Sequence, residues 1–115
     1  MERRNHPRVK VTHPVLYSSD ILPRPRHATT IDLSMGGAGI ETSYGLEKGE
    51  GIEISIAIHS RVIRCRGHVV YTESRTGDRL KTGVQFKEIS KDDGLYLGQY
   101  ISSVVDRRDQ TYLDE

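Results

Sequence analysis

The sequence predicts an α+β chain that is mainly β, with a six-stranded antiparallel β-barrel followed by a C-terminal α-helix. The chain has 115 residues, enough for one hydrophobic core and too few for two. Apolar residues alternate with polar ones in several short segments, which are separated by stretches rich in glycine or proline. Near the C-terminus the apolar spacing changes to that of a helix, so the helix is expected to follow the strands.

The first strand is expected over residues 9–17, where valines and a tyrosine alternate with other residues. We expect an interruption near Pro14, because a proline in a central strand loses a ladder hydrogen bond. Residues 20–26 contain Pro23 and Pro25 and are predicted to form a loop.

The clearest strand covers residues 52–58, where four isoleucines occupy alternate positions. A tight turn at His59 and Ser60 leads to its partner strand, on which we expect Val69 and Tyr71 to share the apolar face. The other strands are expected over residues 28–33, 38–42 and 80–87, with a glycine-rich loop over 43–51.

The C-terminal helix is predicted to begin after Ser90, which can cap it, with Asp93 at the reciprocal capping position. It is expected to end at about Asp106. Its apolar stripe is wide enough to cover an open end of a barrel and consists of Leu97, Tyr100, Ile101, Val104 and Val105. The predicted organisation is an arm over 1–8, the barrel and helix over 9–106, and a tail over 107–115.

The N-terminal arm carries Arg3, Arg4 and Arg8, and Pro7 prevents it from forming an ordinary helix. We expect the arm to be extended, and mobile in the absence of a ligand. Each guanidinium can donate two parallel hydrogen bonds to a phosphodiester and can stack on a base. The arm is therefore predicted to be one half of an anion-binding site.

The second half of the predicted site is the turn that contains Asp32, Ser34, Gly36 and Gly37. On an extended backbone the carboxylate and the hydroxyl, two residues apart, point the same way. We expect the two glycines to turn the chain with positive φ and to let it approach a ligand closely. Together with the arm, this turn suits a purine nucleotide.

These two stretches resemble the signature of PilZ domains, which are bacterial receptors for cyclic di-GMP. The order Arg-x-x-x-Arg followed by Asp-x-Ser-x-x-Gly is more specific than either motif alone. A later Gly-x-x-Phe stretch, at Gly83 and Phe86, resembles the end of the last barrel strand in this family. The matching motif residues are Arg4, Arg8, Asp32, Ser34 and Gly37.

The resemblance implies a role for each motif residue. Arg4 and Arg8 would bind phosphate oxygens or the O6 and N7 edge of guanine. Asp32 would accept hydrogen bonds from the donor edge of guanine and so select against adenine, and Ser34 would bond to base or phosphate. Gly37 would keep the floor of the site free of a side chain.

Two further residues are given a role by the resemblance alone. An extra arginine ahead of the pair, here Arg3, implies binding of two stacked ligand molecules, with a solvated charge as the alternative. Tyr71 matches a position where some PilZ proteins carry a tryptophan that stacks on guanine, with a core role as the alternative. The predicted ligand site therefore comprises Arg3, Arg4, Arg8, Asp32, Ser34, Gly36, Gly37, Tyr71 and Gly83.

Composition limits the other functions that the chain could have. The net charge of +1 gives no overall basic field for nucleic acid. The single Cys65 cannot form an internal disulfide, and no apolar run reaches the length of a membrane span, so a cytoplasmic protein is expected. The five histidines lack a metal-ligand spacing, so neither catalysis nor a metal or other cofactor is expected.

Two alternatives to a cyclic di-GMP receptor remain at this point. A small barrel with a basic arm could bind RNA or single-stranded DNA, although aromatic residues are only 6% and tryptophan is absent. A PilZ domain without ligand could serve as a protein-interaction module, although the motif residues are intact here. In the favoured interpretation, ligand binding orders the arm and creates a surface for an unknown protein partner, in a pathway such as motility or exopolysaccharide regulation.

Overall fold

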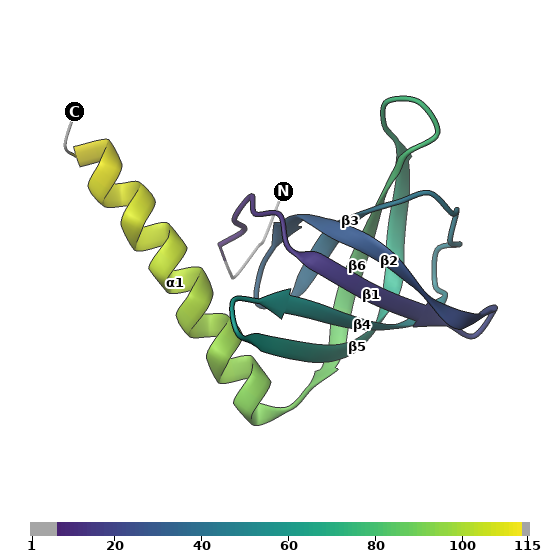
Figure 1. The fold of residues 1–115 in the computed structure, drawn as a ribbon, viewed down its shortest axis with the longest axis horizontal. Coiled ribbons are helices and arrows are strands. Elements are labelled where there is room, and N and C mark those ends of the chain that lie inside the picture. The colour runs from purple at the N-terminus through teal and green to yellow at the C-terminus, as the bar shows by residue number, and fades with distance from the viewer. Residues whose placement is uncertain (1–6, 114–115) are drawn as a thin grey trace.

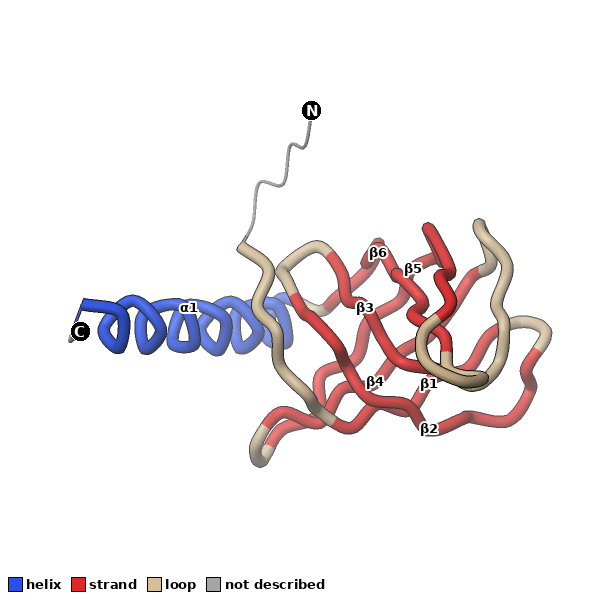
Figure 2. The backbone as a smooth tube through the Cα atoms, turned by 90° about the horizontal axis from the view of Figure 1, so that it is seen from above, coloured by secondary structure: helices blue, strands red, loops and turns tan. Residues whose placement is uncertain are grey.

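The computed structural model describes residues 7–113 and shows a closed barrel with one long helix (Figures 1 and 2). The strand order around the barrel is β1-β2-β3-β6-β5-β4, and every neighbouring pair is antiparallel. The predicted fold class is therefore confirmed. The elements are β1 (Pro14–Ser19), β2 (Leu22–Leu33), β3 (Gly37–Thr42), β4 (Gly51–Ile58), β5 (Arg61–Ser74), β6 (Leu80–Ile89) and α1 (Lys91–Leu113).

The barrel interior is filled by branched aliphatic side chains from alternate positions of the strands. The four isoleucines of β4 point inward and are at most 2% exposed, as their alternation predicted. Ile63 and Val69 from β5, Val84 from β6 and Ile40 from β3 complete the same core. Because one face of each strand is buried, the opposite face is left for polar groups and for a ligand site.

The prediction of a loop over residues 20–26 is wrong, because β2 begins at Leu22 and includes both prolines. In this part of β2 the chain pairs with β1 alone, and pairing with β3 begins only at Thr29. A proline is tolerated where a strand has a partner on one side only, because the missing N–H then breaks no ladder. Pro23 and Pro25 therefore lie within a strand.

The chain before β1 is held on β2 as a separate short ladder. Val9 and Leu33 exchange two backbone hydrogen bonds, each of 2.9 Å. The Thr30 hydroxyl donates to the Val11 carbonyl at 2.6 Å and accepts from the His13 amide at 2.9 Å. The expected strand over residues 9–17 is thus divided, and its continuous part begins at Pro14.

Helix α1 begins as predicted but ends later than predicted. The Ser90 hydroxyl accepts a hydrogen bond of 3.1 Å from the Asp93 amide, which confirms the cap. The Asp93 carboxylate accepts from Arg61 and from the Arg64 amide, and so fastens the helix to β5. The expected end near Asp106 is wrong, because the helix continues to Leu113 through a stretch without glycine or proline.

The first half of α1 covers one end of the barrel, and the second half projects away from it (Figures 1 and 2). The predicted stripe is buried at Leu97, Tyr100, Ile101 and Val104. No helix in the described part of the chain is long and apolar enough to cross a bilayer.

Three rings join the helix to the barrel. His13, which precedes β1, places its Nε2 atom 2.5 Å from the Tyr100 hydroxyl. His59 in the turn between β4 and β5 lies edge-on to both rings, with centroid distances of 6.3 Å to His13 and 5.5 Å to Tyr100. Burial, and then the nearby charge of His59, lower the pKa of His13 below its ordinary value.

Candidate functional site

The short ladder before β1 places Arg8 beside Asp32. Val9 and Leu33 are paired and both point into the core, where they are at most 2% exposed. Their neighbours Arg8 and Asp32 therefore both point to the outer face, because successive side chains of an extended chain alternate. The Arg8 guanidinium donates to Asp32 Oδ1 and forms an ion pair with it.

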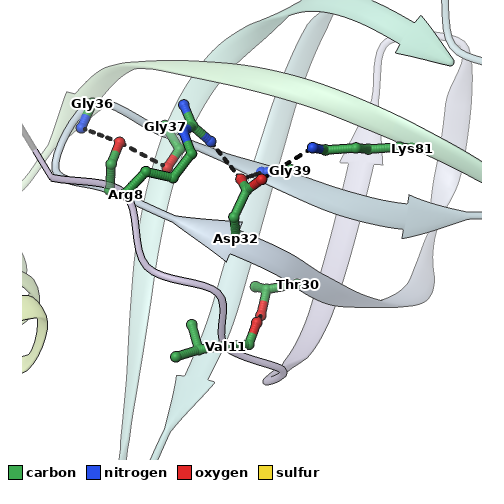
Figure 3. A network of polar contacts seen from close by, with 9 residues as sticks. Arg8, Val11, Thr30, Asp32, Gly36, Gly37, Gly39 and Lys81 are labelled. Atoms are coloured by element: carbon green, nitrogen blue, oxygen red, sulfur yellow. Dashed lines mark hydrogen bonds and ion pairs between the residues drawn. The ribbon is translucent and has the colours of Figure 1, made fainter. Parts of the chain in front are cut away.

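Asp32 is held from several sides (Figure 3). The Lys81 ammonium lies 3.0 Å from Asp32 Oδ2 and approaches from the side opposite to Arg8. The Gly39 amide donates to Asp32 Oδ1 at 2.9 Å. These contacts leave Asp32 only 6% exposed. The carboxylate is thus the centre of a compact polar cluster on the outer face of the barrel.

The charges in this cluster stabilise one another. Burial by itself would raise the pKa of Asp32, but the hydrogen bonds and charges of Lys81 and Arg8 outweigh it and lower that pKa. Burial by itself would lower the pKa of Lys81, but Asp32 outweighs it and raises that pKa. All three groups are therefore charged at neutral pH, and the cluster carries a net positive charge that suits an anionic ligand.

The turn between β2 and β3 is organised by Ser34. Its amide donates to the Gly37 carbonyl at 2.9 Å, and its hydroxyl accepts from the Gly36 amide at 3.2 Å. The Gly36 carbonyl in turn accepts from the Phe86 amide at 2.9 Å, which ties the turn to β6. Ser34 is 5% exposed, so in this structure its hydroxyl serves the turn itself.

The expected positive φ at Gly36 and Gly37 is wrong, because the glycines with positive φ in the described chain are Gly49 and Gly77. Gly37 is needed for another reason. A Cβ at this position would lie 2.3 Å from the Val84 carbonyl oxygen of β6. Gly37 thus permits close approach of two strands, and its missing side chain does not face a ligand floor.

Two other glycines make room for neighbouring side chains beside Asp32. Asp32 pairs with Gly39, Gly39 with Gly83, and Gly83 with Tyr71, so the four residues form one row across four strands. A Cβ on Gly39 would lie 2.7 Å from Lys81 Cε, and a Cβ on Gly83 would lie 2.2 Å from the Tyr71 ring. The glycines therefore allow the lysine stem and the tyrosine ring to lie against the backbone.

Tyr71 reaches this row because β5 is irregular. The register between β5 and β6 shifts between Val69 and Tyr71, so one residue of β5 is left without an opposite partner. Val69 remains in the core at 0% exposed, whereas Tyr71 lies opposite Gly83 on the outer face and is half-buried. The expectation that the two share the apolar face is wrong for this reason.

The structure describes seven of the nine predicted site residues, on the outer row and in the turn beside it. Arg8, Asp32, Gly83 and Tyr71 lie along the outer row, and Ser34 organises the turn at its end, followed by Gly36 and Gly37. Arg3 and Arg4 lie outside the described residues. No group of three or more histidine, cysteine, aspartate or glutamate side chains within residues 7–113 could hold a metal ion.

Sequence reasoning missed Lys81 and Gly39. A lysine on a strand usually marks a solvated face, so Lys81 gave no local signal. Gly39 did give one, because an isolated glycine inside a strand indicates close approach of another group. Only the pairing of β2, β3 and β6 shows that these two residues meet at Asp32.

The Arg8 guanidinium has one donor that the described part of the protein does not use. The Nε atom of Arg8 is buried and has no hydrogen-bond partner among the residues that the structure describes. A buried donor without an acceptor costs free energy that a ligand oxygen can recover. The site therefore combines a positive charge, an aromatic ring and a donor without a partner in the described chain.

A closed barrel with a cationic cluster on its outer face is typical of small ligand-binding modules. The family model described as PilZ domain matches residues 2–103, and the chain belongs to this family. PilZ domains are binding modules rather than enzymes. No curated protein matches the chain.

Solved structures share the fold at low sequence identity. The PilZ domain of YcgR from Escherichia coli, solved with c-di-GMP, has a TM-score of 0.75 at 17% identity, covering 99% of each chain. MotI/DgrA, the inhibitor of motility from Bacillus subtilis, has a TM-score of 0.79 at 20% identity, over 94% of this chain and 54% of its own. The MrkH–c-di-GMP complex from K. pneumonia has a TM-score of 0.79 at 16% identity, over 96% of this chain and 56% of its own. The chain thus spans about half the length of MotI/DgrA and MrkH.

Proposed function

We propose that the protein is a receptor for cyclic di-GMP, which binds between the N-terminal arginines and the turn from Asp32 to Gly37. The observation that carries this proposal is the row on the outer face, where Arg8 and Lys81 converge on Asp32 and the Tyr71 ring lies close to the Lys81 ammonium. Structures of YcgR and MrkH with c-di-GMP show that barrels of this fold bind this ligand.

Each part of the ligand has a matching group in the site. The donor edge of guanine fits the Asp32 carboxylate, which is already surrounded by N–H donors in this structure. Phosphate oxygens fit the guanidiniums of Arg4 and Arg8, including the buried Nε of Arg8. The Tyr71 ring offers a surface on which a guanine base can stack.

The arm provides the signal in this proposal. Arg4 closes on the ligand from the N-terminal side, and Arg3 enlarges the site for two stacked ligand molecules. Fixing each arm residue costs roughly 1 to 2 kcal/mol of backbone entropy, so several charged hydrogen bonds are needed to offset the cost. A ligand with two phosphates supplies them, and the closed arm then forms a new surface for a partner protein.

Isothermal titration calorimetry tests the proposal. We expect the protein to bind cyclic di-GMP and to be silent toward cyclic GMP, cyclic di-AMP and a single-stranded oligonucleotide, and the stoichiometry reports one or two ligand molecules per chain. Arg8→Ala is expected to weaken binding by more than about tenfold, because charged hydrogen bonds to phosphate are lost. Arg75→Ala, in the exposed turn between β5 and β6, is the matched control.

Two outcomes would contradict the proposal. Silence toward cyclic di-GMP, together with oligonucleotide binding that weakens steeply with salt, would identify a nucleic-acid-binding barrel instead. An unchanged isotherm for Arg8→Ala would show that the ligand binds elsewhere on the protein.

A further inference from the structure

We propose that Lys81 is a ligand-binding residue that exchanges partners: it occupies Asp32 in the free protein and transfers its ammonium to a ligand phosphate when guanine takes its place. This inference rests on the proposed function. It adds a residue outside the two sequence motifs and a defined order of contacts at Asp32.

Both carboxylate oxygens of Asp32 already have donors in the free protein. Oδ1 already accepts from Arg8 and from the Gly39 amide. Oδ2 lies 3.0 Å from the Lys81 ammonium, which is its only partner among the described residues. The donor edge of guanine carries two adjacent N–H groups, which a carboxylate accepts best with both oxygens. Guanine therefore competes directly with Lys81 for Oδ2.

The Lys81 side chain lies close to both β3 and the Tyr71 ring. Its Cε atom lies 2.7 Å from the place that a Cβ on Gly39 would take, so the stem lies close to the backbone of β3. The ammonium lies 5.9 Å from the centroid of the Tyr71 ring, and the lysine side chain is 24% exposed. The charge thus lies between the carboxylate and the proposed stacking ring, where a bound dinucleotide would lie.

The Lys81 ammonium needs a new anion when guanine takes its place at Asp32. Guanine is neutral, so its arrival at Asp32 would leave the Lys81 ammonium without its anion in a partly covered place, which is costly. Glu41 lies opposite Lys81 in the register, but its carboxylate is engaged by Arg79 at 2.9 Å. A ligand phosphodiester is then the anion that restores the balance, and the flexible lysine stem allows the ammonium to reach it.

The test compares three variants with the wild-type protein by calorimetry at low and high salt. Lys81→Met keeps the length of the stem and removes the charge, and Lys81→Arg keeps the charge. Lys87→Met removes an exposed lysine from the same strand and is the matched control. If thermal melting shows that Lys81→Met is unfolded, Lys81→Gln replaces it, because glutamine keeps a hydrogen-bond donor for Asp32.

We expect Lys81→Met to weaken cyclic di-GMP binding by about tenfold and to make the affinity less dependent on salt, since one contact between unlike charges is lost. Lys81→Arg is expected to stay within about threefold of wild type and to keep the salt dependence, because the charge is retained. Lys87→Met is expected to behave as wild type.

Unchanged or stronger binding of cyclic di-GMP by Lys81→Met would overturn the proposed exchange. Lys81 would then only hold Asp32 in place or compete with the ligand for it. Weaker binding with an unchanged salt dependence would overturn the exchange too, since it would indicate a structural role. Failure of the wild-type protein to bind cyclic di-GMP would instead reject the proposed function, so the two failures are distinguishable.

Discussion

At the scale of single residues, Asp32 would, in the proposed function, link the fold to the choice of ligand. It accepts hydrogen bonds from the backbone of β3 and from two cations, and its own burial is offset by them. Such a carboxylate is costly to remove, because its departure leaves Arg8 and Lys81 facing each other without an anion. Its roles in stability and in selectivity are therefore coupled.

Asp32→Ala is expected to lower the preference for cyclic di-GMP over cyclic di-AMP, because the acceptor for the donor edge of guanine is lost. The ratio of the two dissociation constants measures the effect. Asp78→Ala, in the exposed turn between β5 and β6, is the control for the loss of one carboxylate. An unchanged ratio in Asp32→Ala would place guanine recognition on another residue.

The sequence motifs predicted part of this cluster and left part of it out. Arg8 and Asp32 were found because each belongs to a spaced motif, and the structure confirms that they meet. Lys81 was missed because its role depends on which strand lies next to β3. The spacing of residues along the sequence does not predict the order of the strands in the barrel. Tyr71 was assigned to the ligand by resemblance, while its alternation with Val69 pointed to the core.

At the scale of elements, the pairing of β5 with β6 determines where Tyr71 points. A strict two-residue period would have placed Tyr71 in the core with Val69, and the register shift between them moves it outward. Bulges depend on both strands of a pair, so the sequence of β5 alone gave no reason to expect one. The same pairing requires glycine at position 83, because the tyrosine ring occupies the place of a side chain.

Gly83→Ala is expected to displace the Tyr71 ring and to lower the free energy of unfolding by about 1 to 3 kcal/mol, the usual cost of overpacking. Chemical denaturation followed by circular dichroism measures this change. Gly45→Ala is the matched control, because its Cβ would lie 3.8 Å from Leu80 Cδ1, which is an ordinary van der Waals contact. Equal stability of both variants would show that Tyr71 moves aside without cost.

Other elements show the limits of local patterns in the same way. The alternation of isoleucines was sufficient to predict β4 and its buried face, because side chains of a half-buried strand have a strict period of two. Pro23 and Pro25 were misleading, since their effect depends on whether a second strand lies beside them. The end of α1 was placed too early, although no residue between Asp106 and Leu113 breaks a helix.

At the scale of the whole molecule, we expect the contact between the barrel and α1 to be sensitive to pH. His13 is partly buried against Tyr100, and burial followed by the charge of His59 lowers its pKa from 6.5. The unfolded chain therefore takes up this proton at a higher pH than the folded protein does. Stability that is present above pH 6.5 is lost as the pH falls through the lowered pKa of His13.

We expect the free energy of unfolding to fall as the pH falls below about 6.5, and to fall less steeply in His13→Gln, which no longer titrates. Urea denaturation at a series of pH values measures both slopes. His27→Gln, at an exposed position of β2, is the control and should keep the wild-type slope. Parallel slopes for wild type and His13→Gln would assign the acid sensitivity to other groups.

The length of α1 has a mechanical consequence. The helix has 23 residues and so is about 35 Å long. Its second half projects away from the barrel, whereas Asp93 and the buried stripe fasten the helix to the barrel mainly in its first half. Gly98 in this half lies against Met35, whose turn also contains Ser34. A tilt of a few degrees at Asp93 and the buried stripe would therefore move the far end of the helix backbone, at Leu113, by several ångströms.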